Sequence, residues 1–137
     1  MPVTPWFVVI TALFVTALLT ANVIAVKLVD VAPDGTAYIV ADTIFRARYR
    51  NGFAKSELMT PGKIYEIRLT PMVTSIRFEK GHRIRVEVTS SNFPKFVRNL
   101  NTGGANESES EPVVATNAIH HAGDDASYVE LPVVPLR

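Results

Sequence analysis

The sequence contains no cysteine, which excludes disulfide bonds, thiolate metal sites, iron–sulfur clusters and thiol nucleophiles. It also lacks an excess of either charge, because 14 basic and 13 acidic residues give a formal net charge of +1. A nucleic-acid-binding protein would need a basic face, so no nucleic-acid partner is expected. The nucleophile-elbow pattern G-x-S-x-G and the glycine-rich phosphate loops are absent too. The sequence therefore contains no motif typical of a catalytic site.

Charge is also missing from one region, because residues 1–26 contain no acidic or basic side chain. Residues 6–26 form an apolar run whose polar interruptions are Thr11, Thr16, Thr20 and Asn22. A helix of about 20 apolar residues spans the hydrocarbon core of a bilayer. Trp6 and Lys27 stand where interfacial anchors are expected. The sequence thus predicts an N-terminal apolar helix in residues 1–26 that crosses a membrane through residues 6–26.

Other interpretations of this segment stay open. A secretory signal peptide could be cleaved after Ala25, although residues 1–5 lack Lys and Arg and the apolar run is longer than usual. A buried helix or a gene-model artefact are further alternatives. Basic residues follow the segment and none precedes it, so the positive-inside rule predicts a cytoplasmic location for residues 27–137. Secretion is the alternative location.

Residues 27–137 alternate between apolar and polar side chains at the period of β-strands. Turn signals such as Pro33-Asp34-Gly35 and Asn51-Gly52 separate the alternating segments. The segments lie at residues 27–31, 45–50, 65–70, 76–79, 83–88 and 129–133. The pattern predicts a mainly β protein, a jelly-roll-like β-sandwich, with a hairpin at residues 76–88 and a long solvated loop at 99–112.

Few side chains in this pattern suggest chemistry. His82 lies in a predicted turn, where we expect a structural role in contact with backbone or solvent. His120 and His121 precede Asp124 and Asp125, a cluster that could interest a metal or act as a base. Neighbouring residues on a strand point to opposite faces, however, so the two imidazoles cannot easily bind the same ion. A solvated turn is therefore favoured.

Three polar groups complete the candidates, and a structural interpretation is favoured for each. A row formed by Arg46, Arg48 and Arg50 could meet an acidic partner or anionic lipid, but a solvated sheet face is commoner. Ser90 and Ser91 follow a predicted strand and should satisfy nearby backbone groups. Glu107, Glu109 and Glu111 lack the spacing of a calcium loop. We therefore assign no catalytic, cofactor-binding or metal residue, and no cofactor.

Five segments stand in a recognisable order and spacing: KLVDVAPDG, IFRARYR, PGKIYEIRL, FEKGHRIRVEVTSSNFPKFVRNLNTG and HAGDDASYVELPVVP. Together they resemble the C-terminal β-sandwich domain of the X-Pro dipeptidyl-peptidase and cocaine esterase family of serine hydrolases, over residues 25–135. The resemblance implies a galactose-binding-like jelly roll, of which residues 27–137 form the later part. It also implies a partner, an α/β-hydrolase domain that carries the Ser-Asp-His triad and whose cleft the jelly roll helps to shape.

No triad residue matches this sequence, so the resemblance implies a hydrolase family but a chain without catalysis of its own. Residues 11–28 resemble the first helix of the queuosine-precursor (vitamin-uptake-like) transporter family. The two resemblances meet near residues 25–28, which favours a recombined gene or a fragment. A partial sandwich would expose strand edges, which predicts self-association. The second hypothesis is a membrane-anchored β-sandwich that binds a partner or a carbohydrate.

Overall fold

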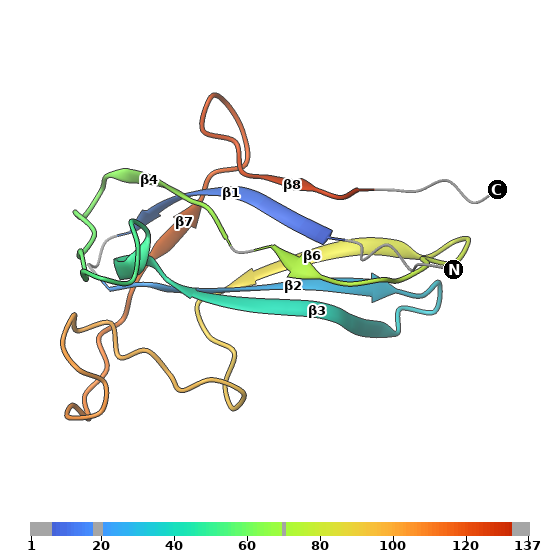
Figure 1. Cartoon of the computed structure of the whole chain (residues 1–137). Coiled ribbons are helices and arrows are strands. Elements are labelled where there is room, and N and C mark those ends of the chain that lie inside the picture. Colours follow the sequence, from blue (N-terminus) through green and yellow to red (C-terminus); the bar gives the residue numbers. More distant parts are fainter. Residues whose placement is uncertain (1–6, 18–20, 70, 133–137) are drawn as a thin grey trace.

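The computed structural model describes residues 7–17, 21–69 and 71–132. These residues form two antiparallel β-sheets that face each other as a sandwich (Figure 1). The elements in chain order are β1 (Phe7–Ala17), β2 (Val23–Val31), β3 (Ala37–Arg46), the 3-10 turn η1 (Ala47–Tyr49), β4 (Ile64–Ile67), β5 (Met72–Val73), β6 (Arg83–Thr89), β7 (Asn117–Ile119) and β8 (Tyr128–Glu130).

The first sheet is built around β1, which pairs with β4, β5, β7 and β8. The segments β4 and β5 continue one register along β1, with Leu13 opposite Ile67 and Val8 opposite Met72. They therefore behave as one interrupted strand. Because β4 and β7 both pair with Val15 of β1, they must lie along its opposite edges.

The second sheet has the order β3-β2-β6, with β2 in the centre (Figure 1). A tight turn joins β2 to β3, where Gly35 has φ 90° and the Thr36 amide donates to the Asp34 carboxylate at 2.8 Å. Glycine suits this left-handed position because it has no Cβ. The turn predicted from Pro33-Asp34-Gly35 is thus confirmed.

The core lies between the two sheets. Ile24, Val26 and Leu28 alternate along β2 and pack against residues of β1, β4 and β5. The buried members of this cluster are Leu13, Val15, Ala17, Ile24, Val26, Leu28, Ala47, Met59, Ile67, Leu69 and Met72. Burying one large aliphatic side chain contributes about 1.5–3 kcal/mol to stability. The core thereby joins elements that are far apart in sequence and confirms the predicted β-sandwich.

The predicted N-terminal helix is wrong. The apolar run forms two strands, β1 and β2, and β2 continues without interruption through residue 26. Ala25, the proposed cleavage position, is fully buried in the middle of β2, between Ile44 and Thr89. A strand that is buried on both faces and a membrane helix both have a continuous apolar run in the sequence. In that case β-branched residues favour the strand.

Among the described residues there is no helix with the length and hydrophobicity that a membrane crossing requires. The cytoplasmic location of residues 27–137, and the alternative of secretion, stay predictions.

Two local predictions also differ from the structure. The strand expected at residues 45–50 ends at Arg46, and η1 follows, so the three arginines do not form a row on one sheet face. Residues 76–79 are not a strand, although β6 and the turn before it form as expected. In both cases a short alternation did not suffice to form a strand, because strand propensity depends on the surrounding sheet.

Candidate interaction surface

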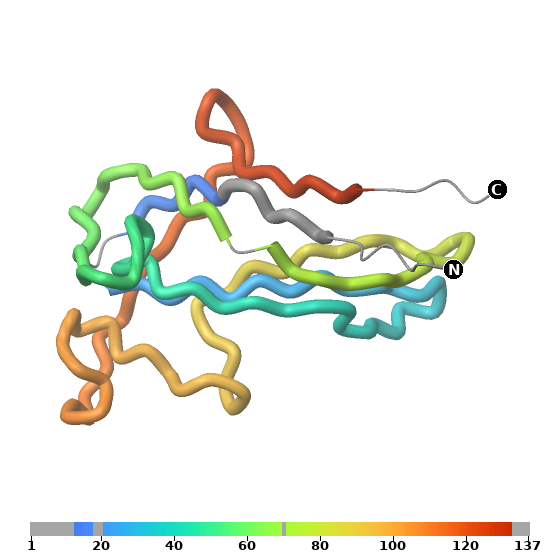
Figure 2. Tube along the Cα trace, viewed as in Figure 1, coloured from blue at the N-terminus to red at the C-terminus, as the bar shows by residue number. Residues whose placement is uncertain are grey.

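The longest segment without regular structure joins β6 to β7, over residues 90–116. We call it the β6–β7 loop; it includes the solvated loop predicted at residues 99–112. Figure 1 and Figure 2 show it extending from the second sheet, on the side away from β1. Loops of this length in compact domains are uncommon and are often functional.

The first part of the β6–β7 loop is anchored to β3. Asn92 Nδ2 donates to Asp42 Oδ2 at 3.0 Å, and Lys95 Nζ donates to the two oxygens of the same carboxylate at 2.6 and 2.8 Å. The hydrogen bond from Lys95 holds the pKa of Asp42 below its usual value, although partial burial opposes this shift. Asp42 pairs with Lys27 of β2, so this anchor lies on the outer face of the sheet.

Two further anchors hold the middle of the loop. Asn99 Nδ2 donates to the carbonyl of Ala21 at 2.5 Å, just before β2 begins. The Arg48 guanidinium, in η1, donates to the Gly104 carbonyl at 3.4 and 3.5 Å. Val23 and Ala25 face away from the core yet are 5% and 0% exposed. The loop lies on this side of the sheet (Figure 1), so the second sheet is covered on both faces near the start of β2.

The loop is also bonded within itself. The Val113 amide donates to the Leu100 carbonyl at 2.9 Å, and Asn101 Nδ2 donates to the Val113 carbonyl at 3.0 Å. Asn106 Nδ2 donates to the Arg98 carbonyl at 3.2 Å. Asparagine side chains thus replace the missing strand ladder, since each can both donate to and accept from backbone. The loop is a built structure and not a random connection.

The loop exposes apolar side chains beside its charged and polar ones. Four large side chains point to solvent although the loop is tightly bonded, and their exposed fractions are 57% for Phe93, 78% for Val97, 44% for Val113 and 91% for Val114. The Arg98 guanidinium lies over the Phe93 ring, with its central carbon 4.4 Å from the centroid. Arg98 forms no ion pair within residues 7–17, 21–69 and 71–132. Clustered exposed apolar side chains often mark an interaction site.

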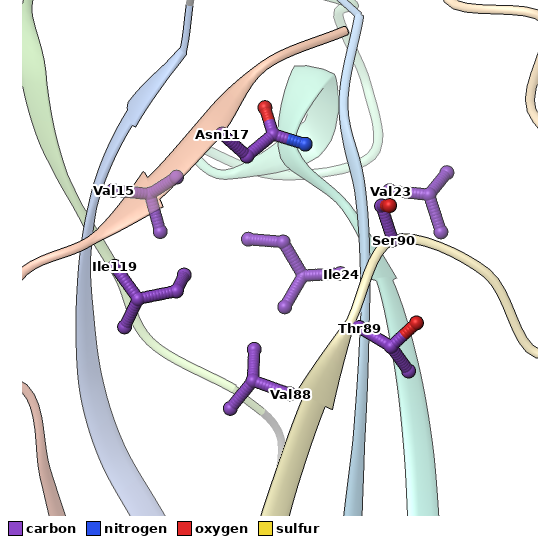
Figure 3. A pocket seen from close by; sticks show the side chains of 8 residues that line it. All are labelled: Val15, Val23, Ile24, Val88, Thr89, Ser90, Asn117 and Ile119. Atoms are coloured by element: carbon purple, nitrogen blue, oxygen red, sulfur yellow. The ribbon is translucent and has the colours of Figure 1, made fainter.

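A small cavity of about 240 Å³ lies at the root of the loop, between the two sheets (Figure 3). Its walls are Val15, Val23, Ile24, Val88, Thr89, Ser90, Asn117 and Ile119. Asn117 Oδ1 is buried there and has no hydrogen-bond partner among the described residues. No charged side chain lines the cavity, so it offers no acid, base or metal ligand.

The histidines serve structural contacts. His82 Nδ1 lies 2.8 and 3.0 Å from the two carboxylate oxygens of the buried Asp30, so its partner is a side chain and not backbone. His120, the residue after β7, has its Nε2 atom 2.6 Å from Thr16 Oγ1, and this contact joins the end of β7 to β1. His121 is exposed. The described residues contain no group of three His, Cys, Asp or Glu side chains that could hold a metal ion.

The predicted arginine row divides into different roles. Arg46 is exposed, Arg48 holds the β6–β7 loop, and Arg50 is largely buried. The Arg50 guanidinium donates to the Glu57 carbonyl at 2.6 Å and lies 4.6 Å from the centroid of the Tyr65 ring. Arg50 therefore fixes the segment that follows η1, and it does not form part of a solvated basic face.

The serines and glutamates of the loop carry no catalytic arrangement. Ser90 and Ser91 are exposed, and in the described residues no serine hydroxyl is bonded to a histidine. Of the three glutamates, Glu109 accepts a hydrogen bond from Thr102 within the loop. Acyl transfer requires a nucleophile next to a base, and this pair is not formed in the part of the chain that the structure describes.

Sequence reasoning missed the residues that hold the loop. Asp42, Asn92, Lys95 and Asn99 are spread over two segments, and no pattern in the sequence pairs them. The signal that was present is compositional, because asparagines recur at positions 92, 99, 101 and 106. Asparagine favours turns and local backbone bonds, so this density indicates a structured loop.

The molecule is an antiparallel β-sandwich with an apolar loop surface and without an assembled nucleophile and base in its described residues. This arrangement defines the class of antiparallel β-sandwich domains. A family described as the X-Pro dipeptidyl-peptidase C-terminal non-catalytic domain matches residues 10–130. The chain belongs to this family, as the resemblance of its five segments predicts, although the match begins earlier than residue 25.

Known relatives support the same family. The chain is 44% identical to the cocaine esterase of Rhodococcus sp. (strain MB1 Bresler) over 124 residues, which cover 89% of this chain and 22% of the esterase. An aminopeptidase from a marine sediment archaeon, Thaumarchaeota archaeon, has a TM-score of 0.84 and 30% identity over 96% of this chain and 24% of its own. A selenomethionine-labelled alpha-amino acid ester hydrolase has a TM-score of 0.80 and 28% identity, covering 98% and 24%. The chain thus spans about a quarter or less of the relatives that it matches.

The resemblance of residues 11–28 to a transporter helix is not supported. The hydrolase family match includes these residues, and they form parts of β1 and β2 where the structure describes them. Since β2 crosses residues 25–28 without a break, the proposed junction between two unrelated pieces is not visible in the fold.

Proposed function

We propose that this chain is an accessory domain that packs on an α/β-hydrolase catalytic domain and helps to shape its substrate cleft. The observation that carries the proposal is the match of residues 10–130 to a domain family described as C-terminal and non-catalytic. The structural likeness to two hydrolytic enzymes, each about four times longer, supports it. Residues 27–137 would then be the later part of a longer jelly roll.

The class of reaction follows from the relatives. One is named an esterase, one an ester hydrolase and one an aminopeptidase, so all three cleave acyl bonds to oxygen or nitrogen. We propose the same class, hydrolysis of an ester or of an X-Pro dipeptide amide, for the assembled enzyme. This chain would supply shape and stability to the cleft and no reacting group, since its described residues lack a nucleophile and base in contact.

An activity measurement on the chain tests this division of roles. The purified chain is incubated with X-Pro-arylamides and with aryl esters, and we expect release of the chromophore at the rate of buffer alone. Turnover that a serine-directed phosphonate abolishes would overturn the proposal, because it would reveal a nucleophile in this chain.

A chimera tests the accessory role directly. This chain replaces the matching 124-residue segment of the Rhodococcus cocaine esterase. If the sandwich is an accessory domain of this family, the chimera folds and hydrolyses aryl esters, whereas the esterase without that segment loses most of its activity or stability. An inactive, unfolded chimera would count against the accessory role.

We also propose that the isolated chain self-associates through the edges of its second sheet. Within the described residues, β3 and β6 are each paired on one side, with β2. Unpaired edges present free backbone donors and acceptors to another chain. Size-exclusion chromatography with light scattering should then show a concentration-dependent dimer, and a monodisperse monomer with a sharp thermal transition would contradict this.

A further inference from the structure

The β6–β7 loop exposes large apolar side chains although several of its polar groups are bonded inward. Phe93, Val97, Val113 and Val114 face solvent, while Asn92, Lys95 and Asn99 bind β3 and the start of β2. Charged side chains of the loop, among them Glu107, Glu109 and Glu111, are exposed as well. Exposed apolar side chains on an anchored loop are typical of an interaction site.

The members of this surface belong to one hydrogen-bonded loop. Arg98 stacks on Phe93, and Leu100 and Asn101 bind the backbone of Val113 next to Val114. The apolar side chains therefore lie on neighbouring limbs of one bonded loop. We call Phe93, Val97, Arg98, Val113 and Val114 the loop surface.

The loop surface also has a charge that calls for a partner. Arg98 is exposed, and its guanidinium has an aromatic contact but no carboxylate in the described part of the chain. Lys95, by contrast, is committed to Asp42. A guanidinium over an aromatic ring can still bind a carboxylate through its N–H groups. A complementary surface would thus be apolar with one acidic group.

We propose that the loop surface is where this domain docks on the catalytic domain, with Arg98 facing a carboxylate of that domain. This inference rests on the proposed function. In the relatives about three quarters of the polypeptide lies outside the matched segment, so a large partner surface is available in the same molecule. Covering the loop would bury its apolar side chains and complete a third layer beneath the second sheet.

Other apolar side chains offer a matched comparison. Val73 is 64% exposed and pairs with Phe7 of β1, and Arg83 is exposed at the start of β6, where it pairs with Val31. Neither belongs to the β6–β7 loop. Val73→Asp and Arg83→Glu therefore change the same kinds of group as Val114→Asp and Arg98→Glu, but outside the loop surface.

The experiment measures thermal unfolding and ester hydrolysis of the cocaine esterase chimera described above. We expect Val114→Asp and Arg98→Glu each to lower its melting temperature by about 3 °C or more and to weaken activity at elevated temperature. The control variants Val73→Asp and Arg83→Glu should leave both nearly unchanged. The opposite ranking would place the contact elsewhere and overturn the proposal.

The chain by itself supplies a second test. Because the loop surface faces solvent in the isolated domain, Val114→Asp and Arg98→Glu should leave its own melting temperature within about 1 °C. A larger loss would show that these residues support the sandwich itself and would contradict a docking role. A parent chimera that fails to fold refutes the accessory role, whereas a stable chimera that ignores the loop variants refutes only the docking surface.

Discussion

The two faces of the second sheet are covered in different ways. On its inner face, Ile24, Val26 and Leu28 of β2 pack against the aliphatic side chains of the first sheet. On its outer face, the β6–β7 loop is held by polar contacts, chiefly those of Asp42 with Lys95 and of Asn99 with the Ala21 carbonyl. The inner contact depends on area and shape, while the outer one depends on a few directional bonds.

This difference shows how one small domain can combine a firm scaffold with a surface suited to binding. Hydrophobic burial is roughly proportional to area and tolerates exchange of similar side chains. Directional hydrogen bonds contribute less each, but they fix where a loop lies. The anchors of the loop are polar, and Phe93, Val97 and Val114 are exposed. Substitutions on the two faces should therefore differ in size and in kind.

The largest effect is expected on the inner face. Leu28→Ala should lower the free energy of unfolding by about 2–5 kcal/mol, because it leaves a cavity in the core where Leu28 is 1% exposed. Val114→Ala, at a position 91% exposed, is the control and should change it by less than about 0.5 kcal/mol. Urea unfolding followed by circular dichroism measures both. Equal effects would erase the contrast between the faces.

Removing the Asn99 anchor should have an intermediate effect. Asn99→Ala leaves the Ala21 carbonyl without this donor and should cost about 1–3 kcal/mol. Hydrogen exchange should quicken mainly at the Val113 amide and its loop neighbours, whereas the amides of β2 stay protected. The exposed Asn51, which bonds only to the Glu57 carboxylate at 2.7 Å, serves as the control in Asn51→Ala. Uniform loss of protection would mean that the loop and the sandwich unfold as one unit.

The Asp42–Lys95 pair predicts a dependence on pH. The folded-state pKa of Asp42 is lowered, chiefly by the hydrogen bond from Lys95. The pair therefore stabilises the fold fully above the unfolded-state pKa of about 3.9, and this contribution is lost as the pH falls through the lower folded-state pKa. Lys95 is 59% exposed, so the effect at neutral pH should be below about 1 kcal/mol.

A double-mutant cycle with Asp42→Asn and Lys95→Met isolates this pair. The coupling free energy should be present at pH 6 and disappear at strongly acidic pH. A coupling that is unchanged between these conditions would mean that ionisation of Asp42 does not contribute.

The smallest effect is expected for Arg48. Its hydrogen bonds to the Gly104 carbonyl are long, at 3.4 and 3.5 Å, and exposed. Arg48→Ala should therefore change the free energy of unfolding by less than about 0.5 kcal/mol. Arg50→Ala is the informative counterpart, because Arg50 is largely buried and donates to backbone carbonyls, and it should cost more. If Arg48 proved the costlier substitution, the polar cover would be stronger than its geometry indicates.

The inner face could be predicted only in part, and the outer cover could not be predicted. Alternation placed β4, β6 and residues 27–31 of β2 correctly, because one buried face imposes a period of two, but Ile24 and Val26 of the inner face lay in the segment predicted as a helix. The same rule failed for β1 and for the start of β2, since the apolar run of a strand buried on both faces, as β2 is, resembles that of a membrane helix. The anchor between Asp42 and Lys95 joins residues 53 positions apart, and nothing local to either residue specifies the other.

The position of β1 at the centre of the first sheet has a consequence for biosynthesis. Its residue Val15 pairs with Ile119, and Val9 pairs with Glu130, near the opposite end of the described chain. Translation adds about 5–20 residues per second, so on the order of 5–20 s pass between the emergence of β1 and that of its last partners. During that interval β1 has been synthesised but the last strands that pair with it have not. We expect folding to be slower than that of a chain of local hairpins, because the pairing of β1 must wait for strands that are made much later.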